Sequence, residues 1–129
     1  MTICIDTLDN GIRVITEEIK SIESVSVGIW INAGSRNEHK TENGIAHFLE
    51  HMAFKGTEKR SALQIAEEIE NVGGFMNAYT SREITCYYAK VLKDHLPLAV
   101  DILSDIISNS IFNENEIEIE KGVIIQEIG

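Results

Sequence analysis

The chain has 129 residues and a formal net charge of -10, with 43% hydrophobic and 25% charged side chains. This length suits one domain with a hydrophobic core, and the composition is that of a soluble globular protein. The acidic balance argues against a nucleic-acid partner, which needs clustered Lys and Arg, and no apolar run approaches the roughly eighteen residues of a membrane span.

The N-terminus has neither the basic start and apolar core of a secretory signal nor the Arg-rich character of a transit peptide. We therefore expect a cytoplasmic protein of bacterial type, with a processed protein of the mitochondrial matrix as the alternative. The cysteines, Cys4 and Cys86, are only two and far apart in the sequence. We expect two buried free thiols rather than a disulfide framework.

Strand patterns dominate the first part of the chain. Residues 2–8 and 12–18 flank Asp9-Asn10-Gly11. This pattern predicts a hairpin, because Asn-Gly supplies the positive φ angles of a tight turn. A third, β-branched strand is expected to follow and to end at residues 33–34.

Two helices are expected next. The first is predicted over about residues 43–55 and ends at Gly56, a residue type favoured just after a helix. Ser61 followed by Gln64 is a capping-box pattern that opens the second helix. The glycines at 73–74 end it.

The remaining pattern contains two strands and two helices. The strands are expected over residues 75–80 and 84–92. A helix then begins near Leu96, with the lone proline, Pro97, in its first turn, and the last helix begins near Asn113. Hairpin-paired strands followed by helices favour an α+β fold, with a largely antiparallel sheet and helices packed on one face.

His47, Glu50 and His51 form the pattern H-x-x-E-H inside an otherwise apolar helix. The two histidines lie about 40° apart around the helix and about 6 Å apart along its axis. Both imidazoles can then reach one divalent ion, with Glu50 beside the open position of that ion. The alternative is a pair of hydrogen-bonded core histidines with Glu50 as a surface charge. Three clustered ionisable groups cost desolvation energy unless an ion or water offsets it, which favours a zinc site.

A catalytic zinc site needs a third protein ligand and an open fourth position. From the residues alone, the downstream candidates remain open: Cys86, His95, Glu114, Glu116, Glu118, Glu120 and Glu127. Glu120 and Glu127 lie two turns apart on one face of the last expected helix. A solvated charged face is the alternative, although Glu127 lies in an apolar stretch.

Four stretches resemble the N-terminal region of the pitrilysin–insulysin family of zinc peptidases, and most of all its mitochondrial processing-peptidase branch. They cover residues 32–38, 43–57, 73–92 and 118–128. In that family the third zinc ligand is a glutamate 76 residues after the second histidine. The position corresponds to Glu127 here.

The resemblance implies a role for each residue of the pattern. It implies that His47, His51 and Glu127 bind one Zn2+ per chain and that Glu50 is the general base. Zinc would lower the pKa of its water toward 7 and polarise the scissile carbonyl, and Glu50 would take the proton of that water. Glu120 would orient a ligand histidine without binding the metal itself.

Residues 75–80 resemble the edge strand on which the family binds a peptide by strand addition. Asn77 and Ala78 would offer the nearest contacts, although a strand-end turn residue is the alternative reading of Asn77. The function implied is a zinc-dependent endopeptidase that hydrolyses peptides or presequence-like segments of unfolded polypeptides.

Family members contain two related halves that close on the substrate, in one chain or in paired subunits. The resemblance therefore implies that residues 1–129 form an incomplete N-terminal domain, with the rest of it and the second half absent. We expect such a chain to bind zinc, to self-associate and to be poorly active alone.

Two other functions are considered. One is a non-catalytic structural or partner subunit of a processing-peptidase-like assembly, which the four retained motif residues disfavour. The other is a lyase that shares the H-x-x-E-H helix and would use Cys86 as its third ligand, but the strand around Cys86 matches the peptidases.

Overall fold

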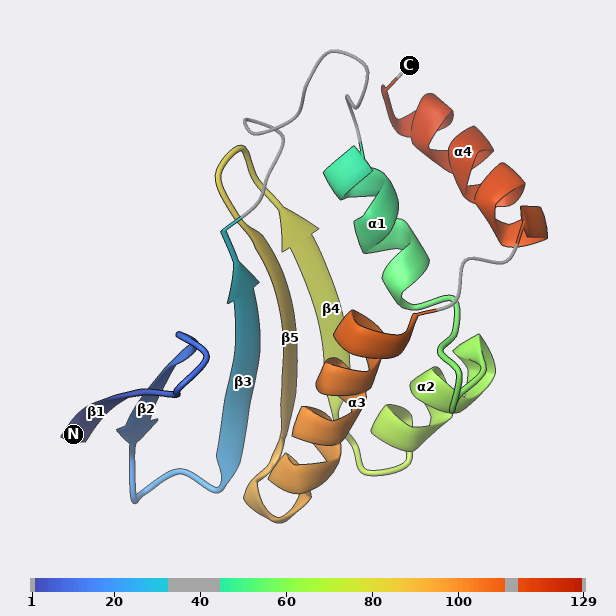
Figure 1. The fold of residues 1–129 in the computed structure, drawn as a ribbon. Helices are drawn as coiled ribbons and strands as arrows, with labels where there is room; N and C mark the ends of the chain where they lie inside the picture. Colours follow the sequence, from blue (N-terminus) through green and yellow to red (C-terminus); the bar gives the residue numbers. More distant parts are fainter. Residues whose placement is uncertain (1, 33–44, 111–113, 129) are drawn as a thin grey trace.

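The computed structural model describes residues 2–32, 45–110 and 114–128. A three-stranded antiparallel sheet carries helices on one face, and a separate two-stranded hairpin stands beside it (Figure 1). The strands are β1 Thr2–Thr7, β2 Arg13–Glu18, β3 Ser24–Ile31, β4 Phe75–Thr80 and β5 Thr85–Leu92. The helices are α1 Ile45–Ala53, α2 Ala62–Glu70, the 3-10 turn η3 Lys93–His95, α3 Leu96–Asn109 and α4 Glu114–Ile128. The predicted α+β architecture is confirmed.

The main sheet has the strand order β3-β5-β4, with both pairs antiparallel. In this register Trp30 lies opposite Cys86 on one side of β5, and Ala78 lies opposite Tyr87 on the other. Within the described residues β4 pairs only with β5, so β4 is one of the two edge strands of this sheet, with β3 as the other. The edge position predicted for residues 75–80 is therefore present.

The N-terminal hairpin forms where the Asn-Gly signal predicts it. Gly11 has a φ of 93°, and the N–H of Ile12 donates to Asn10 Oδ1 at 3.1 Å. β1 and β2 pair along their whole length but form a sheet of their own. Their large apolar side chains remain exposed, with Ile3 at 64% and Ile5 at 65%.

Local capping signals set the helix ends. The Ser61 hydroxyl accepts the N–H of Gln64 at 3.1 Å, and the Gln64 side chain accepts the N–H of Ser61 at 2.8 Å, which confirms the capping box. Gly56 and Gly73 have φ angles of 134° and 71°, a region that favours glycine. Pro97 lies in the first turn of α3, as expected.

α3 is the helix at the centre of the core. Its buried side chains include Ile102, Leu103 and Ile106, and the helix contacts β5 and β3. α2 contributes Ile65 and Ile69 to the same core cluster. Together these contacts make α3 and the sheet one packed unit.

The expectation for the two thiols is half right. Cys86 is buried and Cys4 is exposed, and both are free. Cys4 is exposed because it belongs to β1, whose residues are exposed along the whole strand. The expected ends at residues 33–34, near 43 and at Asn113 lie outside the described residues. No helix in the described ranges is long and apolar enough to cross a membrane.

Candidate functional site

The H-x-x-E-H pattern lies within α1, so the helical spacing that the sequence predicts is present in the backbone. The end of this helix is firmly packed: Met52 is 0% exposed and Ala53 is 5% exposed. Phe54 follows the helix, and its ring centroid lies 6.5 Å from that of Tyr87 on β5. Glu50 and His51 are themselves half-buried. Packing on the sheet thus fixes the end of α1 that carries these two side chains.

Tyr87 is a neighbour of the motif that the sequence did not point to. Its side chain is 7% exposed. Burial raises the pKa of Tyr87, and the nearby Glu50 charge raises this pKa further. The Glu50 carboxylate therefore lies close enough to β5 to act on the Tyr87 hydroxyl. Only the alternation of β5, which turns Tyr87 toward the helices, carried a signal for the position of this side chain.

α4 brings the position of the third expected ligand to the motif helix. It packs against α1, and Figure 1 shows the two helices side by side. Positions 120 and 127 both lie on α4. The side chains of His47, Glu120 and Glu127 lie outside the described residues. The structure thus unites the helices that carry these positions.

The chemistry of this donor set fits zinc. Imidazole nitrogens and carboxylate oxygens are common zinc ligands, and a catalytic site takes three of them. Among the side chains that the structure describes, no three metal-binding groups form a cluster. The fit of these positions to zinc therefore rests on their residue types and on the contact between the helices that carry them.

β4 is the second partner of α1. The two elements contact each other, so the motif helix lies beside the edge strand. Asn77 is exposed, Ala78 is 8% exposed, and the Ala78 N–H donates to Asn77 Oδ1 at 2.8 Å. In an antiparallel pair, alternate residues direct their backbone groups away from the partner strand. The bond to a side chain indicates that the Ala78 N–H is one of the groups at the open edge.

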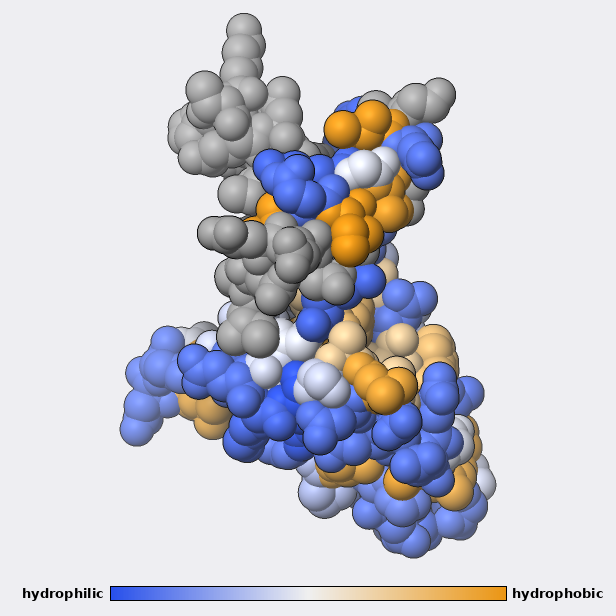
Figure 2. Space-filling view, turned by 90° about the vertical axis from the view of Figure 1, so that its right-hand side faces the viewer, coloured by the Kyte–Doolittle hydropathy of each residue, from blue (hydrophilic) through white to orange (hydrophobic). Residues whose placement is uncertain are grey.

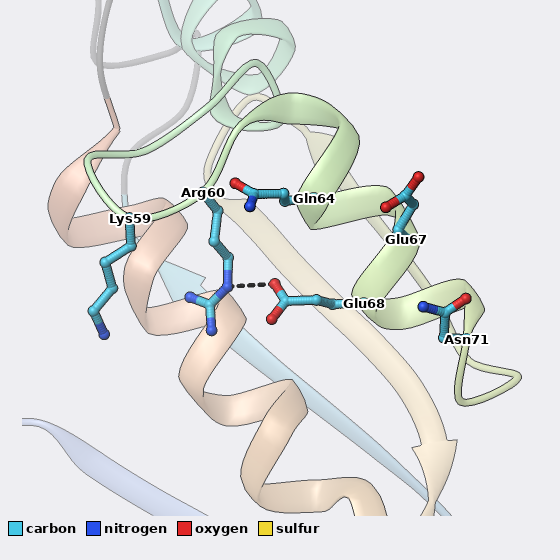
Figure 3. Close-up of a pocket in the computed structure, with 6 residues that line it drawn as sticks. All are labelled: Lys59, Arg60, Gln64, Glu67, Glu68 and Asn71. Carbon is cyan, nitrogen blue, oxygen red and sulfur yellow. Dashed lines mark hydrogen bonds and ion pairs between the residues drawn. The ribbon is translucent and has the colours of Figure 1, made fainter.

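A surface pocket of about 400 Å³ lies at α2, away from the motif. Its lining residues are Lys59, Arg60, Gln64, Glu67, Glu68 and Asn71. Figure 3 shows Arg60 and Glu68 pointing toward each other, with Arg60 Nε and Glu68 Oε2 at 2.5 Å. No expected site residue lines this pocket, so it is separate from the candidate site.

Comparison with known proteins places this arrangement in a family. The family described as Insulinase (Peptidase family M16) matches residues 13–129. The beta subunit of the mitochondrial-processing peptidase of Rattus norvegicus is 59% identical over 121 residues, covering 94% of this chain and 24% of that protein. The "Uncharacterized zinc protease YmxG" of Bacillus subtilis is 51% identical over 122 residues, covering 95% of this chain and 30% of that protein.

A solved structure agrees with these relatives. The crystal structure of a protease from Helicobacter pylori superposes with a TM-score of 0.91 at 30% sequence identity. The match covers 98% of this chain and 30% of that one. The chain thus spans between about a quarter and a third of the length of the relatives it matches. With nearly its whole length matched by sequence and by fold, this chain belongs to the insulinase family of peptidases, family M16.

Proposed function

We propose that the chain is the metal-binding part of a zinc-dependent endopeptidase that hydrolyses peptides or presequence-like segments. One observation carries this proposal. The helix with the H-x-x-E-H pattern, α1, contacts both α4, which holds positions 120 and 127, and the edge strand β4. The metal site and the peptide-binding edge would then both lie next to α1.

Each motif residue has a role in the proposed reaction. His47, His51 and Glu127 would hold one Zn2+ per chain, with Glu120 orienting a ligand histidine by hydrogen bonding. Zinc supplies Lewis-acid chemistry, acidifying water and polarising a carbonyl. Glu50 takes a proton from the attacking water and later passes it to the leaving amine. The Glu50 charge raises the pKa of the buried Tyr87 beyond the effect of burial, so the carboxylate lies near the sheet.

The substrate would bind as an added strand. β4 has an open edge within the described residues, and pairing with the Ala78 backbone and the Asn77 carboxamide would lay an extended peptide beside α1. Unfolded segments suit this mode, because folded strands already have partners. We therefore propose peptides or unfolded polypeptides as the substrate class.

The chain would act with further protein. It spans about a quarter of the length of the rat relative. We propose that residues 1–129 are an incomplete N-terminal domain, completed by a second half or a partner subunit. Relatives come from both bacteria and mitochondria. We propose a bacterial-type cytoplasmic location, with the mitochondrial matrix as the alternative.

Substitutions in the motif test the proposal. Glu50→Gln should keep about one zinc per chain and lower peptide cleavage at least ~10²-fold, because the general base is lost and the ligands remain. His47→Ala and His51→Ala should lose the metal. The measurements are metal content after gel filtration and turnover of an unstructured peptide by a longer chain that includes this domain, with and without chelator.

The outcomes separate the alternatives. An empty site in Glu50→Gln would make Glu50 a ligand and would overturn the roles assigned here. Loss of zinc in Cys86→Ala would favour the lyase alternative. Bound zinc with no Glu50-dependent turnover in the longer chain would favour the non-catalytic subunit.

A further inference from the structure

The segment between α1 and α2 is bonded to the end of α3. The Thr57 hydroxyl donates to Asp105 Oδ2 at 2.6 Å. Both residues are buried, at 4% and 3% exposure. The same hydroxyl oxygen accepts the N–H groups of Lys59 and Arg60 at 3.2 and 3.0 Å. One side chain thus shapes the turn after α1 and ties it to α3.

Arg60 extends this contact with all three of its guanidinium nitrogens. Nη1 lies 2.8 Å from Asp105 Oδ2, Nη2 lies 2.6 Å from Asp101 Oδ2, and Nε bonds to Glu68 (Figure 3). Asn109 Nδ2 donates to the other oxygen of Asp105 at 3.1 Å. Burial would lower the pKa of Arg60, but its hydrogen bonds to these carboxylates raise this pKa overall. The buried Asp105 charge is therefore paired with the largely buried Arg60 charge.

The backbone continues the junction toward α4. The N–H of Glu58 donates to the carbonyl oxygen of Asn109 at 3.1 Å, and Thr57 and Ser110 form an isolated antiparallel bridge. Ser110 follows α3 directly, and α4 begins at Glu114. The segment leaving α1 therefore contacts the end of α3 from which the chain continues toward α4.

We infer that Thr57, Arg60 and Asp105 form a clamp that sets the position of α1 relative to α4, and that they are positioning residues for the metal site. This inference rests on the proposed function, in which α1 carries two ligands and α4 the third. The role assigned to the clamp is distinct from binding metal or substrate.

The geometry gives the physical reason. Metal ligands must converge to within about 0.2 Å of their ideal distances. The expected ligands His51 and Glu127 lie on different helices and more than half the chain apart, so a small relative shift of α1 and α4 would spread them apart. α3 is a rigid reference, because Ile102, Leu103 and Ile106 bury it against the core. The clamp bonds the segment after α1 to α3, the helix that precedes α4 in the chain.

The chemistry of the clamp supports positioning over bulk stability. A buried ion pair is often no more stabilising than apolar packing of similar volume, but its hydrogen bonds are directional. The planar fork of Arg60 fixes three carboxylates from α2 and α3 in one arrangement. These ion pairs therefore restrict the relative positions of α2 and α3 more than they add to the free energy of unfolding.

The first test compares two near-isosteric variants. Thr57→Val removes the hydroxyl and keeps the shape, whereas Thr57→Ser keeps the hydroxyl. Ile102→Val is the control, because Ile102 is fully buried in α3 and its loss of one methylene costs stability without touching the clamp. The readouts are zinc affinity by chelator competition and the visible spectrum of the Co2+-substituted chain, which reports ligand geometry.

We expect Thr57→Val to bind zinc about 10–100-fold more weakly, the range typical of groups that orient metal ligands, and to change the Co2+ spectrum. Thr57→Ser and Ile102→Val should match the parent in both readouts. Parent-like affinity and spectrum in folded Thr57→Val would overturn the inference. If Thr57→Val does not fold, Arg60→Lys takes its place, and unfolding of both variants would also overturn it, since the clamp would then be a general stability element.

The second test needs no metal. Spin labels at Leu49→Cys on α1 and Ile125→Cys on α4 occupy exposed positions, and Cys4→Ser removes the exposed native thiol. The doubly labelled chain is diluted with unlabelled chain, and the label-to-label distance distribution is recorded. Thr57→Val should widen or shift this distribution, and Ile102→Val should not.

The two tests separate the inference from the proposed function. A changed distance distribution, combined with zinc binding that does not depend on His47, would uphold the clamp and overturn the zinc assignment. An unchanged distribution in folded Thr57→Val would overturn the clamp, whatever the metal does.

Discussion

Asp105 is a buried carboxylate that remains charged. Burial alone would raise the pKa of Asp105, but hydrogen bonds from Thr57, Asn109 and Arg60 bring it below the usual range. A carboxyl whose pKa is lower in the folded chain than in the unfolded chain stabilises the fold above its unfolded value of about 3.9. This stabilisation is lost as the pH falls through the lower, folded value.

Asp105→Asn should therefore destabilise the chain near neutral pH by about 3 kcal/mol, because it leaves Arg60 with one buried partner fewer. The difference in the free energy of unfolding between Asp105→Asn and the unsubstituted chain should shrink as the pH falls below about 4. Urea unfolding from pH 7 to pH 3 measures both effects. A constant difference across this range would mean that the Asp105 charge does not contribute to the stability.

The sequence revealed only part of the candidate site at the residue scale. His47, Glu50 and His51 could be predicted because helical spacing relates them within one turn and a half. Tyr87 and Asp105 could not, because the effect of Glu50 on Tyr87 and the hydrogen bond of Thr57 to Asp105 join residues far apart in the sequence. The roles of Glu120 and Glu127 came from the resemblance and stay predictions, as do those of Asn77 and Ala78.

Among the elements, α4 offers a test with an internal control. Glu120→Gln should weaken zinc binding by about 10–100-fold, because a neutral amide orients a ligand imidazole less well than a carboxylate. Glu118→Gln is the matched control, since Glu118 is exposed and its side chain pairs with Lys121 at 3.3 Å. Chelator competition measures both variants. Equal affinities in the two variants and the parent would make Glu120 an ordinary surface charge.

The elements themselves were predictable where the signal is local. The Asn10-Gly11 turn, the Ser61 capping box and the start of α3 at Pro97 each depend on residues within one turn. The separation of the N-terminal hairpin from the main sheet was not predictable. An alternation of apolar and polar residues predicts a strand, but it does not predict which sheet the strand joins. The wrong expectation for Cys4 has the same cause.

The whole molecule exposes much apolar surface. The hairpin exposes Ile3, Ile5 and Ile15, and α4 exposes Ile119 at 57% and Ile125 at 69%. Figure 2 shows hydrophobic side chains over the upper part of one face, where α4 lies. Large exposed apolar patches are typical of association surfaces.

We therefore predict that the 129-residue chain associates as its concentration rises. Salt should strengthen the association, because it screens the repulsion between chains with a net charge of -10. Replacing Ile5 and Ile15 together by Thr should weaken it, while Ile102→Val should have no effect. Sedimentation velocity over a concentration series measures this, and a compact monomer throughout would contradict the prediction.

The proposed catalytic rate also depends on the molecule as a whole. The chain spans 24% of the rat processing-peptidase subunit. We predict that the 129-residue chain cleaves unstructured peptides at least about 10²–10³-fold more slowly than a longer chain of this protein, because groups that stabilise a developing oxyanion are each worth that much. Chelator and Glu50→Gln are the controls. Equal, Glu50-dependent rates for the two chains would show that this part of the protein suffices.

Asn77 supplies an acceptor for an N–H at the open edge of β4 from within the chain. A peptide carbonyl that pairs with Ala78 must first displace the Asn77 carboxamide, so one hydrogen bond is exchanged for another at that position. In the proposed binding mode, backbone pairing there would add little net free energy, and discrimination between peptides would depend on their side chains. The same exchange makes it less favourable for two copies of β4 to join edge to edge. In the proposed binding mode, this edge would favour partners that bring contacts beyond their backbone.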